Sequence, residues 1–361
     1  VINTDGTVGI VTLTTSDTPI VGTPVVFESA YTGHIAATYD STNGKVVIAY
    51  HDAGNSYYGT AIVGTVSGTS ITFGTPVVFE SAFTSNISLV HDSSNNKMVI
   101  AYCDNDNSYY GTAIVGTVSS TSISFGTAVV FQSSSLQQVG TSCVYDSVNG
   151  KVVIAYSDNG NSNYGTAIVG TVSSTSISFG TAVVFESADT EQPTALYDSV
   201  NQKIIIAYQD AGNSNYPTAI VGIVSSTSIS FGTAVVLQSA AQYVFAGAYD
   251  STNGKVVIAY GDGSGSGATA VVFGATSVIT NLTAENYIGI AAEAISNTAT
   301  GKINIVGGVN SGQSGLTTAQ TYYVAATGIL TTTAECKVTS DILSVVAGTS
   351  ISDTEILVWR S

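Results

Sequence analysis

Positive charge is the scarcest property of this sequence. The 361 residues include 24 aspartates and glutamates but only 8 lysines and arginines, and the formal net charge is −16. Nucleic-acid binding needs basic side chains that displace the counterions of the phosphates, and anionic membrane surfaces attract basic segments in the same way. We therefore expect neither a nucleic-acid partner nor binding to an anionic membrane.

Long apolar runs, regularly spaced cysteines and catalytic motifs are missing as well. No stretch approaches the ~18 consecutive apolar residues that cross a bilayer, so no membrane insertion is expected. Cys103, Cys143 and Cys336 share no repeat position, which argues against a disulfide framework and predicts small buried side chains. A nucleophile elbow, a phosphate loop, a dinucleotide fingerprint and Cys/His metal spacing are all lacking. The sequence therefore predicts no catalytic residue and no enzymatic activity.

What the sequence does contain is a repeat. A polar Asp-Ser-x-Asn-type turn, followed by a β-branched run that ends in tyrosine, occurs five times at intervals of 52 or 54 residues. Serine, threonine, glycine and asparagine replace charged residues, a composition that suits short strands and tight turns. Self-similarity at this period is the signature of a repeat architecture. The tyrosines that close the five copies are Tyr50, Tyr102, Tyr156, Tyr208 and Tyr260.

The first complete copy predicts four antiparallel strands. They cover about His34–Asp40, Lys45–Asp52, Thr60–Ser67 and Ser70–Glu80, the last of them broken near Gly74. The second strand is apolar at consecutive positions, as expected for a strand that is buried on both faces. Four antiparallel strands repeated about every 50 residues are typical of the blades of a β-propeller.

The two ends of the chain extend this pattern. The segment Thr7–Ala30 matches the third and fourth strands of a copy, and the residues after 261 follow the same order in degenerate form. We therefore predict an all-β fold: a single propeller over residues 1–361, with seven blades and with the N-terminal strands closing the last one. The alternative is five to six blades followed by a small C-terminal β-domain that begins near residue 281.

The copies differ most at two places, which predicts where function lies. One is the connection from the fourth strand to the next copy, and the other is the residue after the closing tyrosine. Both lie at the same end of a propeller blade, and loops on a rigid scaffold are common recognition sites; drift at weakly packed positions is the alternative. His34 and His51 break the repeat and are the strongest single candidates. The ligand-binding candidates are Tyr31, His34, His51, Tyr57, Tyr58, Phe83, Tyr109, Tyr110, Gln137, Gln138, Tyr164, Glu191, Gln209, Tyr216 and Tyr243.

The loops after the second strands carry a repeated Asp-x-x-Asn-Ser-x-Tyr motif. Aspartate and asparagine favour turns by bonding the local backbone, and this is the preferred interpretation. The alternative is a Ca²⁺ site made of loop oxygens, for which Asp104 and Asp106 are the candidates. The loop tyrosines are expected to be exposed, where they would stack on sugar rings or wedge adjacent copies together. Each lysine that begins a second strand, such as Lys45, is expected to pair with the aspartate of its turn, such as Asp40.

Two parts of the sequence resemble a known group of proteins. The repeat at Tyr39–Ser67 resembles repeats in tail-fibre-like and other virion structural proteins of marine tailed bacteriophages. The runs Glu285–Ile290, Ser311–Leu316 and Ala347–Ser352 look like the ending of such proteins, although Trp359-Arg360-Ser361 replaces their usual final lysine-glycine. The resemblance implies a virion or extracellular location, contacts with other virion proteins and homo-oligomer formation.

Together these observations predict a non-enzymatic virion structural or adhesion protein. It would be a tail-fibre or appendage component whose variable loops recognise a host-surface glycan or protein. One alternative is an architectural decoration protein of the capsid or tail. Another is a secreted bacterial lectin or adhesin, and a glycan-degrading propeller is a further possibility.

Overall fold

The computed structural model describes residues 6–8, 11–12, 20–136, 140–262, 267–274, 289–291, 303–305, 309–311, 313–324, 330–331 and 346–358. The chain divides into two compact units, Val1–Ala275 and Thr276–Ser361. The boundary lies close to the alternative one expected near residue 281, while a single propeller over the whole chain stays a prediction. The described residues form an all-β protein of repeated antiparallel sheets without an α-helix, as the sequence indicated.

The strands of repeat one agree closely with those expected. β5 (Thr32–Asp40) pairs with β6 (Lys45–Asp52), and β6 pairs with β7 (Tyr58–Ser67). The fourth strand is broken at residues 74–76 into β8 (Ser70–Phe73) and the beginning of β9 (Val77–Asp92), both of which pair with β7. Gly74 permits this break to lie against the next repeat, because a Cβ there would lie 1.8 Å from the carbonyl oxygen of Thr121.

The same order recurs in repeats two, three and four, and its first three strands recur in repeat five. The strands of repeat two are the second half of β9, β10 (Lys97–Asp104), β11 (Tyr110–Ser119), β12 (Ser122–Phe125) and β13 (Val129–Ser135). Those of repeat three are β14 (Thr141–Asp146), β15 (Lys151–Asp158), β16 (Tyr164–Ser173), β17 (Ser176–Phe179) and the first half of β18 (Val183–Asp198). Repeat four consists of the second half of β18, β19 (Lys203–Asp210), β20 (Tyr216–Ser225), β21 (Ser228–Phe231) and β22 (Val235–Val236). Repeat five contains β23 (Gln242–Asp250), β24 (Lys255–Asp262) and β25 (Ala268–Phe273).

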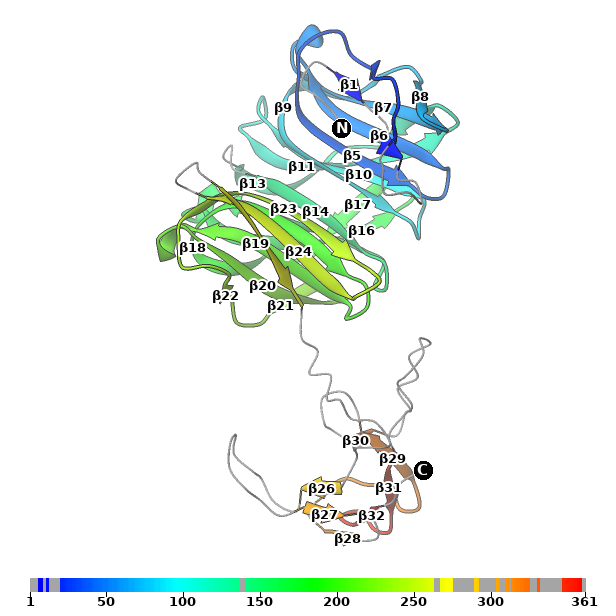
Figure 1. Ribbon diagram of the computed structural model, residues 1–361, viewed down its shortest axis with the longest axis vertical. Coiled ribbons are helices and arrows are strands. Elements are labelled where there is room, and N and C mark those ends of the chain that lie inside the picture. The colour runs from blue at the N-terminus through cyan, green and yellow to red at the C-terminus, as the bar shows by residue number, and fades with distance from the viewer. Residues whose placement is uncertain are drawn as a thin grey trace. The chain divides into compact units, whose positions relative to one another are not determined.

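Two long strands join neighbouring repeats. β9 pairs with β7 through its first half and with β10 through its second half, so repeats one and two share a nine-stranded sheet. β18 joins repeats three and four in the same way. The first strands of successive repeats lie side by side in the N-terminal unit (Figure 1). Cys143 N–H, for example, donates to Ser88 Oγ at 2.9 Å across this contact.

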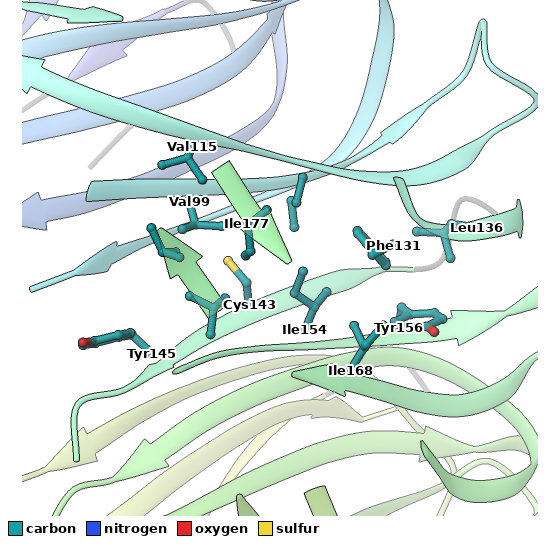
Figure 2. Packing of buried hydrophobic residues seen from close by; sticks show 14 of the residues in the cluster. Val99, Val115, Phe131, Leu136, Cys143, Tyr145, Ile154, Tyr156, Ile168 and Ile177 are labelled. Atoms are coloured by element: carbon teal, nitrogen blue, oxygen red, sulfur yellow. The ribbon is translucent and has the colours of Figure 1, made fainter. Parts of the chain in front are cut away.

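The core lies between the repeats, as the continuous apolar second strands predicted. Val47 and Ala49 pack toward repeat two, whereas Ile48 and Tyr50 pack with Phe27 of the N-terminal strands. Figure 2 shows the equivalent layer between repeats two and three, where Cys143 lies among the apolar side chains. Cys103 and Cys143 are buried free thiols, as expected, while Cys336 lies outside the described residues.

The turns that precede the second strands lie at the end of the repeats away from the loops that follow these strands, and we call this the turn end. Contacts there join neighbouring repeats. Asp40 accepts hydrogen bonds from Thr42 N, Asn43 N and Asn43 Nδ2, and His91 Nε2 of repeat two lies 3.3 Å from its Oδ1. The expected lysine–aspartate pairs are wrong at the positions where the lysine contact is resolved, because Lys45 Nζ donates to Thr65 Oγ1 at 2.8 Å. The aspartates already have closer partners, the backbone N–H groups of their own turns.

The N-terminal strands and the C-terminal unit contain shorter sheets. β1 (Thr7–Val8) pairs with β4 (Val25–Val26) and β2 (Val11–Thr12) with β3 (Ile20–Val21), in line with the expected third and fourth strands. The C-terminal unit has one two-stranded and one five-stranded sheet. Its strands are β26 (Gly289–Ala291), β27 (Ile303–Ile305), β28 (Val309–Asn310), β29 (Thr321–Val324), β30 (Leu330–Thr331), β31 (Val346–Ser350) and β32 (Ile356–Val358).

Candidate functional site

The two variable positions of the repeat lie at one end of the strands, which we call the loop end. Thr32 pairs with Asp52 at the start of β5 and the end of β6, and Gly59 pairs with Glu80 beside them. The connections between repeats and the loops after the second strands therefore meet here. This confirms that the two variable regions share an end, whereas their role in recognition stays a prediction.

The loops after the second strands are tight turns, as the motif indicated. Asp52 Oδ1 accepts a hydrogen bond from Gly54 N at 2.8 Å and begins the 3-10 helix η1 (Ala53–Asn55). Ser56 and Tyr57 then both adopt positive φ angles, 57° and 61°. This left-handed pair presents the Tyr57 side chain at the loop end, where 41% of it is exposed. η2 (Asn159–Asn161) and η3 (Ala211–Asn213) repeat the turn.

Five predicted residues form one aromatic cluster in repeat one. The His51 ring lies at its centre, with ring-centroid distances of 5.1 Å to His34, 5.3 Å to Tyr57, 5.8 Å to Phe83 and 6.1 Å to Tyr31. The Tyr57 and Phe83 rings also contact each other, at 5.1 Å. Tyr31 and Tyr57 keep large exposed faces, 59% and 41%. The cluster thus presents the aromatic rings of Tyr31 and Tyr57 to solvent and buries the imidazole of His51 beneath them.

His51 supplies a polar group at the base of this cluster. Its side chain is only 5% exposed, and its Nδ1 lies 3.2 Å from the carbonyl oxygen of Thr84. Its Nε2 has no hydrogen-bond partner and points toward Gly33, where a Cβ would lie 2.4 Å away. Burial lowers the pKa of His51, although the Thr84 carbonyl and Asp52 oppose this shift.

His34 lies on a β-bulge at the edge of the same cluster. The pairing of β5 with β6 shifts between Gly33 and Ala36, and His34 adopts a positive φ of 48°. Asn86 N donates a hydrogen bond to His34 Nδ1 at 3.2 Å, which links the bulges of repeats one and two. Burial and the nearby His51 both lower the pKa of His34. Because the pKa of His51 is lowered as well, both imidazoles are neutral at pH 7.

The residues equivalent to His51 in repeats two, three and four are buried, and this corrects the expectation that they lie on the variable surface. Cys103 Sγ lies 3.4 Å from the carbonyl oxygens of Tyr109 and Leu136, and Ser157 Oγ donates to the Asn163 carbonyl at 3.2 Å. Gln209 is 1% exposed, with its Oε1 unpartnered. Their side chains alternate with the closing tyrosines and therefore point into the layer between repeats.

The other predicted tyrosines differ in their exposure. Tyr109 is the counterpart of Tyr57 and is 46% exposed. The expectation of exposure is wrong for the tyrosine that ends each loop, because it begins a third strand and is half-buried there. These residues are Tyr58, Tyr110, Tyr164 and Tyr216.

The remaining candidates lie away from the aromatic cluster. Glu191 is half-buried and pairs with Gln209 across β18 and β19. Tyr243 lies in β23 opposite Gly261, and its side chain is outside the described part of the structure. Gln137 and Gln138 also lie outside the described residues.

The two metal candidates have local hydrogen bonds instead of a shared centre. Asp104 Oδ1 accepts a hydrogen bond from Asn107 N at 3.2 Å, and Asp106 Oδ2 accepts one from Phe83 N at 3.4 Å. Burial is the main reason that the pKa of Asp104 is raised. The residues that the structure describes contain no group of three or more His, Cys, Asp or Glu side chains placed to hold a metal ion.

Sequence reasoning missed a row of polar contacts beneath the loop end. Tyr102 Oη donates to Glu80 at 2.9 Å and Tyr208 Oη donates to Glu186 at 3.0 Å, each between neighbouring repeats. Burial raises the pKa of Tyr102 and Tyr208 above the usual range. The recurrence of an acid or amide 22 residues before most closing tyrosines was the available signal. The phenols bind structural partners and are not exposed to ligands.

Comparison with known proteins shows the fold. No protein-family model and no curated sequence matches this chain. The BP39L lectin from Burkholderia pseudomallei is similar over 76% of this chain and 76% of its own, with 10% identity and a TM-score of 0.58. The SapL1 lectin in complex with alpha methyl fucoside aligns over 76% of this chain and 88% of its own, with 14% identity and a TM-score of 0.45. At these identities only the fold is shared, and only the first match is close enough to show it.

The first of these structures overturns the resemblance to bacteriophage virion proteins. The similar fold belongs to a bacterial lectin, and no phage protein supports the earlier resemblance. The expected virion partners are withdrawn with it. The prediction that the chain is not an enzyme agrees with the lectin described for the first structure. Within the described residues, no helix has the length and apolar character required to span a bilayer.

Proposed function

We propose that this chain is a non-enzymatic, lectin-like protein that binds glycans at its loop end. The observation that carries the proposal is the aromatic cluster around His51, in which the exposed side chains of Tyr31 and Tyr57 each combine an aromatic face with a phenol hydroxyl. A pyranose presents an apolar C–H face and a rim of hydroxyls, and aromatic rings with a nearby polar group match both. The similar fold of a bacterial lectin adds support.

In this arrangement each cluster residue has a distinct task. The Tyr57 ring packs against the C–H face of the sugar, while Phe83 holds the Tyr57 ring in place from behind. The His51 ring supports the Tyr57 and Phe83 rings from beneath, and the contact of its Nδ1 with the Thr84 carbonyl fixes the imidazole orientation.

Glycan-array binding followed by calorimetry on a hit tests the proposal. We expect Tyr57→Ala to weaken binding about tenfold, since an aromatic contact contributes roughly 0.5–1.5 kcal/mol beyond its buried area. Tyr109→Ala is the matched control, because Tyr109 occupies the same loop position and is similarly exposed but has no aromatic cluster. The proposal fails if no glycan binds, or if both substitutions weaken binding equally.

We further propose that the repeats close as a seven-bladed β-propeller in an extracellular protein that acts as a homo-oligomer. Successive repeats contact each other at the turn end: Ser94 N donates to Tyr145 Oη at 3.3 Å, and Val200 N donates to Tyr249 Oη at 3.1 Å. Tyr39 is the counterpart of Tyr145 and Tyr249 in repeat one and is 58% exposed. In a closed propeller, the turn of the last repeat would cover this side chain. Protection of Tyr39 from nitration in the full-length protein would support closure, and full reactivity would contradict it.

A further inference from the structure

Charge is segregated along the strands of the N-terminal unit. All five of its lysines begin second strands at the turn end, and residues 1–275 contain no arginine. A second strand such as β6 places its last residue about 23 Å from its first, at ~3.3 Å per residue. The loop end of this unit therefore has no lysine or arginine, and its carboxylates are Glu28, Asp52, Glu80, Asp104, Asp106, Asp158, Glu186, Asp189, Glu191, Asp210 and Asp262.

One of these carboxylates breaks the repeat beside the aromatic cluster. Asp106 stands where the other loops have Gly54, Gly160 and Gly212, and the 3-10 helix found in those loops is missing from this one. Its side chain is exposed, and its Oδ2 accepts the hydrogen bond of Phe83 N. Phe83 belongs to the cluster, so the Asp106 carboxylate lies at the edge of the proposed sugar site.

We propose that the cluster selects saccharides that carry protonated amino groups, and this inference rests on the proposed glycan-binding function. An ammonium group is attracted both to the face of an aromatic ring and to a carboxylate, and the exposed Tyr57 face and Asp106 supply these two partners. The lowered pKa values of His34 and His51 leave both rings uncharged, so they do not repel a cation. A uronate or sialylated glycan would instead meet carboxylates with no basic partner.

The test compares three sugars of similar size by calorimetry on the intact chain. We would use the β-1,4-linked glucosamine hexamer, its fully N-acetylated form and an oligogalacturonate at a pH where the amines are protonated and the two imidazoles are still neutral. We expect the free amine to bind about tenfold more tightly than the N-acetylated form, and the uronate to bind least. The preference should shrink with added salt because charge attraction is screened.

Matched variants locate the effect. Asp106→Gly, the residue of the other loops, and Asp106→Asn should each bring the ratio of the free-amine affinity to the N-acetylated affinity close to one, whatever they do to the N-acetylated affinity itself. Asp189→Asn removes one exposed charge from the same end away from the cluster, and should keep the preference. Unchanged thermal midpoints would show that the variants are folded.

Each outcome is decisive. Equal or tighter binding of the N-acetylated sugar, or tightest binding of the uronate, overturns the inference but leaves glycan binding intact. An amine preference that survives both Asp106 substitutions also overturns it. If none of the three sugars binds while a neutral glycan on the array depends on Tyr57, the amine preference is wrong and the proposed function stands. If no glycan binds at all, both fail.

Discussion

Gln132→Glu should destabilise the protein in a strongly pH-dependent way. Gln132 Nε2 donates to Asp158 Oδ2 at 2.8 Å, and Ser134 Oγ donates to Asp158 Oδ1 at 2.7 Å. The equivalent residue in repeat one is Glu80, which faces Tyr102 and Asp104 of the next repeat. Gln132→Glu would therefore replace an amide–carboxylate contact with a pair of carboxylates in the same layer.

The magnitude follows from the bonds exchanged. The substitution removes a hydrogen bond to a charged group, which contributes about 1.5–3 kcal/mol, and adds repulsion from Asp158. A new hydrogen bond from Tyr156 Oη, like the one between Tyr102 and Glu80, offsets part of the loss. We expect a net loss of about 2 kcal/mol at pH 8, which lowers the thermal midpoint by about 4 °C.

The sign of the pH dependence follows from the existing acid pairs. Burial first, and then the charge of Asp104, raise the pKa of Glu80 above 4.5, while a hydrogen bond from Tyr102 opposes this. Burial and Glu186 likewise raise the pKa of Asp210 above 3.8. A carboxyl whose folded-state pKa is raised destabilises the folded state at high pH, and the penalty disappears as pH falls through that pKa. The new pair should therefore cost most at pH 8 and little near pH 4.

Thermal unfolding of the parent and variant between pH 4 and pH 8 provides the assay. Glu80→Gln is the reverse control and should raise the midpoint at pH 8, because its amide can bond Asp104 as Gln132 bonds Asp158. A loss for Gln132→Glu that is equal at both ends of the pH range would refute the acid-pair reasoning. So would a destabilising Glu80→Gln at pH 8.

Three further predictions concern the cluster and the turns. Gly33→Ala should cost about 1–3 kcal/mol in unfolding free energy, since its Cβ would lie 2.4 Å from His51 Nε2, and it should weaken glycan binding in the same preparation. Glycan affinity should decrease only at pH values below about 6.5, the usual pKa of histidine, because the pKa values of His34 and His51 are lowered and both rings stay neutral down to a lower pH. An NMR titration of both rings checks this, and an affinity loss above pH 6.5 would contradict it. Asp92→Ala should cost about 3 kcal/mol, because this buried carboxylate accepts three hydrogen bonds from its own turn, and Asp250→Ala should cost less in a denaturant titration because Asp250 is more exposed.

The sequence predicted strands well because the repeat supplies its own controls. β6 begins and ends at the expected residues, and the break in the fourth strand falls near Gly74. The apolar pattern of a strand and the residue preferences of a turn are local properties of the sequence, and five copies show which positions keep them. The joining of repeats through β9 was not predictable, since a continuous strand and two strands linked by a short loop have similar composition.

The sequence predicted which residues form the candidate site, but it did not predict which of them are buried or which contact one another. Variation between copies singled out His34 and His51, and the repeated loop motif added Tyr57; the three residues do meet in one cluster. The burial of His51 and the exposed position of Asp106 beside Phe83 depend on contacts between repeats, which no single copy encodes. The lysines were misassigned for a related reason, because Thr65 lies opposite Lys45 only after the strands pair.

The repeats also offer replacements that separate folding from binding. Cys103 occupies the place of His51 in repeat two, where it is 1% exposed and its sulfur contacts two backbone carbonyls. His51→Cys should therefore fold, with a stability loss of about 1–2 kcal/mol from the smaller side chain. It removes the ring at the centre of the aromatic cluster, against which Tyr31, Tyr57 and Phe83 pack, so glycan affinity should fall about tenfold or more. Cys103→Ser is the control, because Ser157 fills that place in repeat three and repeat two lacks the cluster. If His51→Cys keeps full affinity, the imidazole is structural and the sugar site lies elsewhere on the loop end.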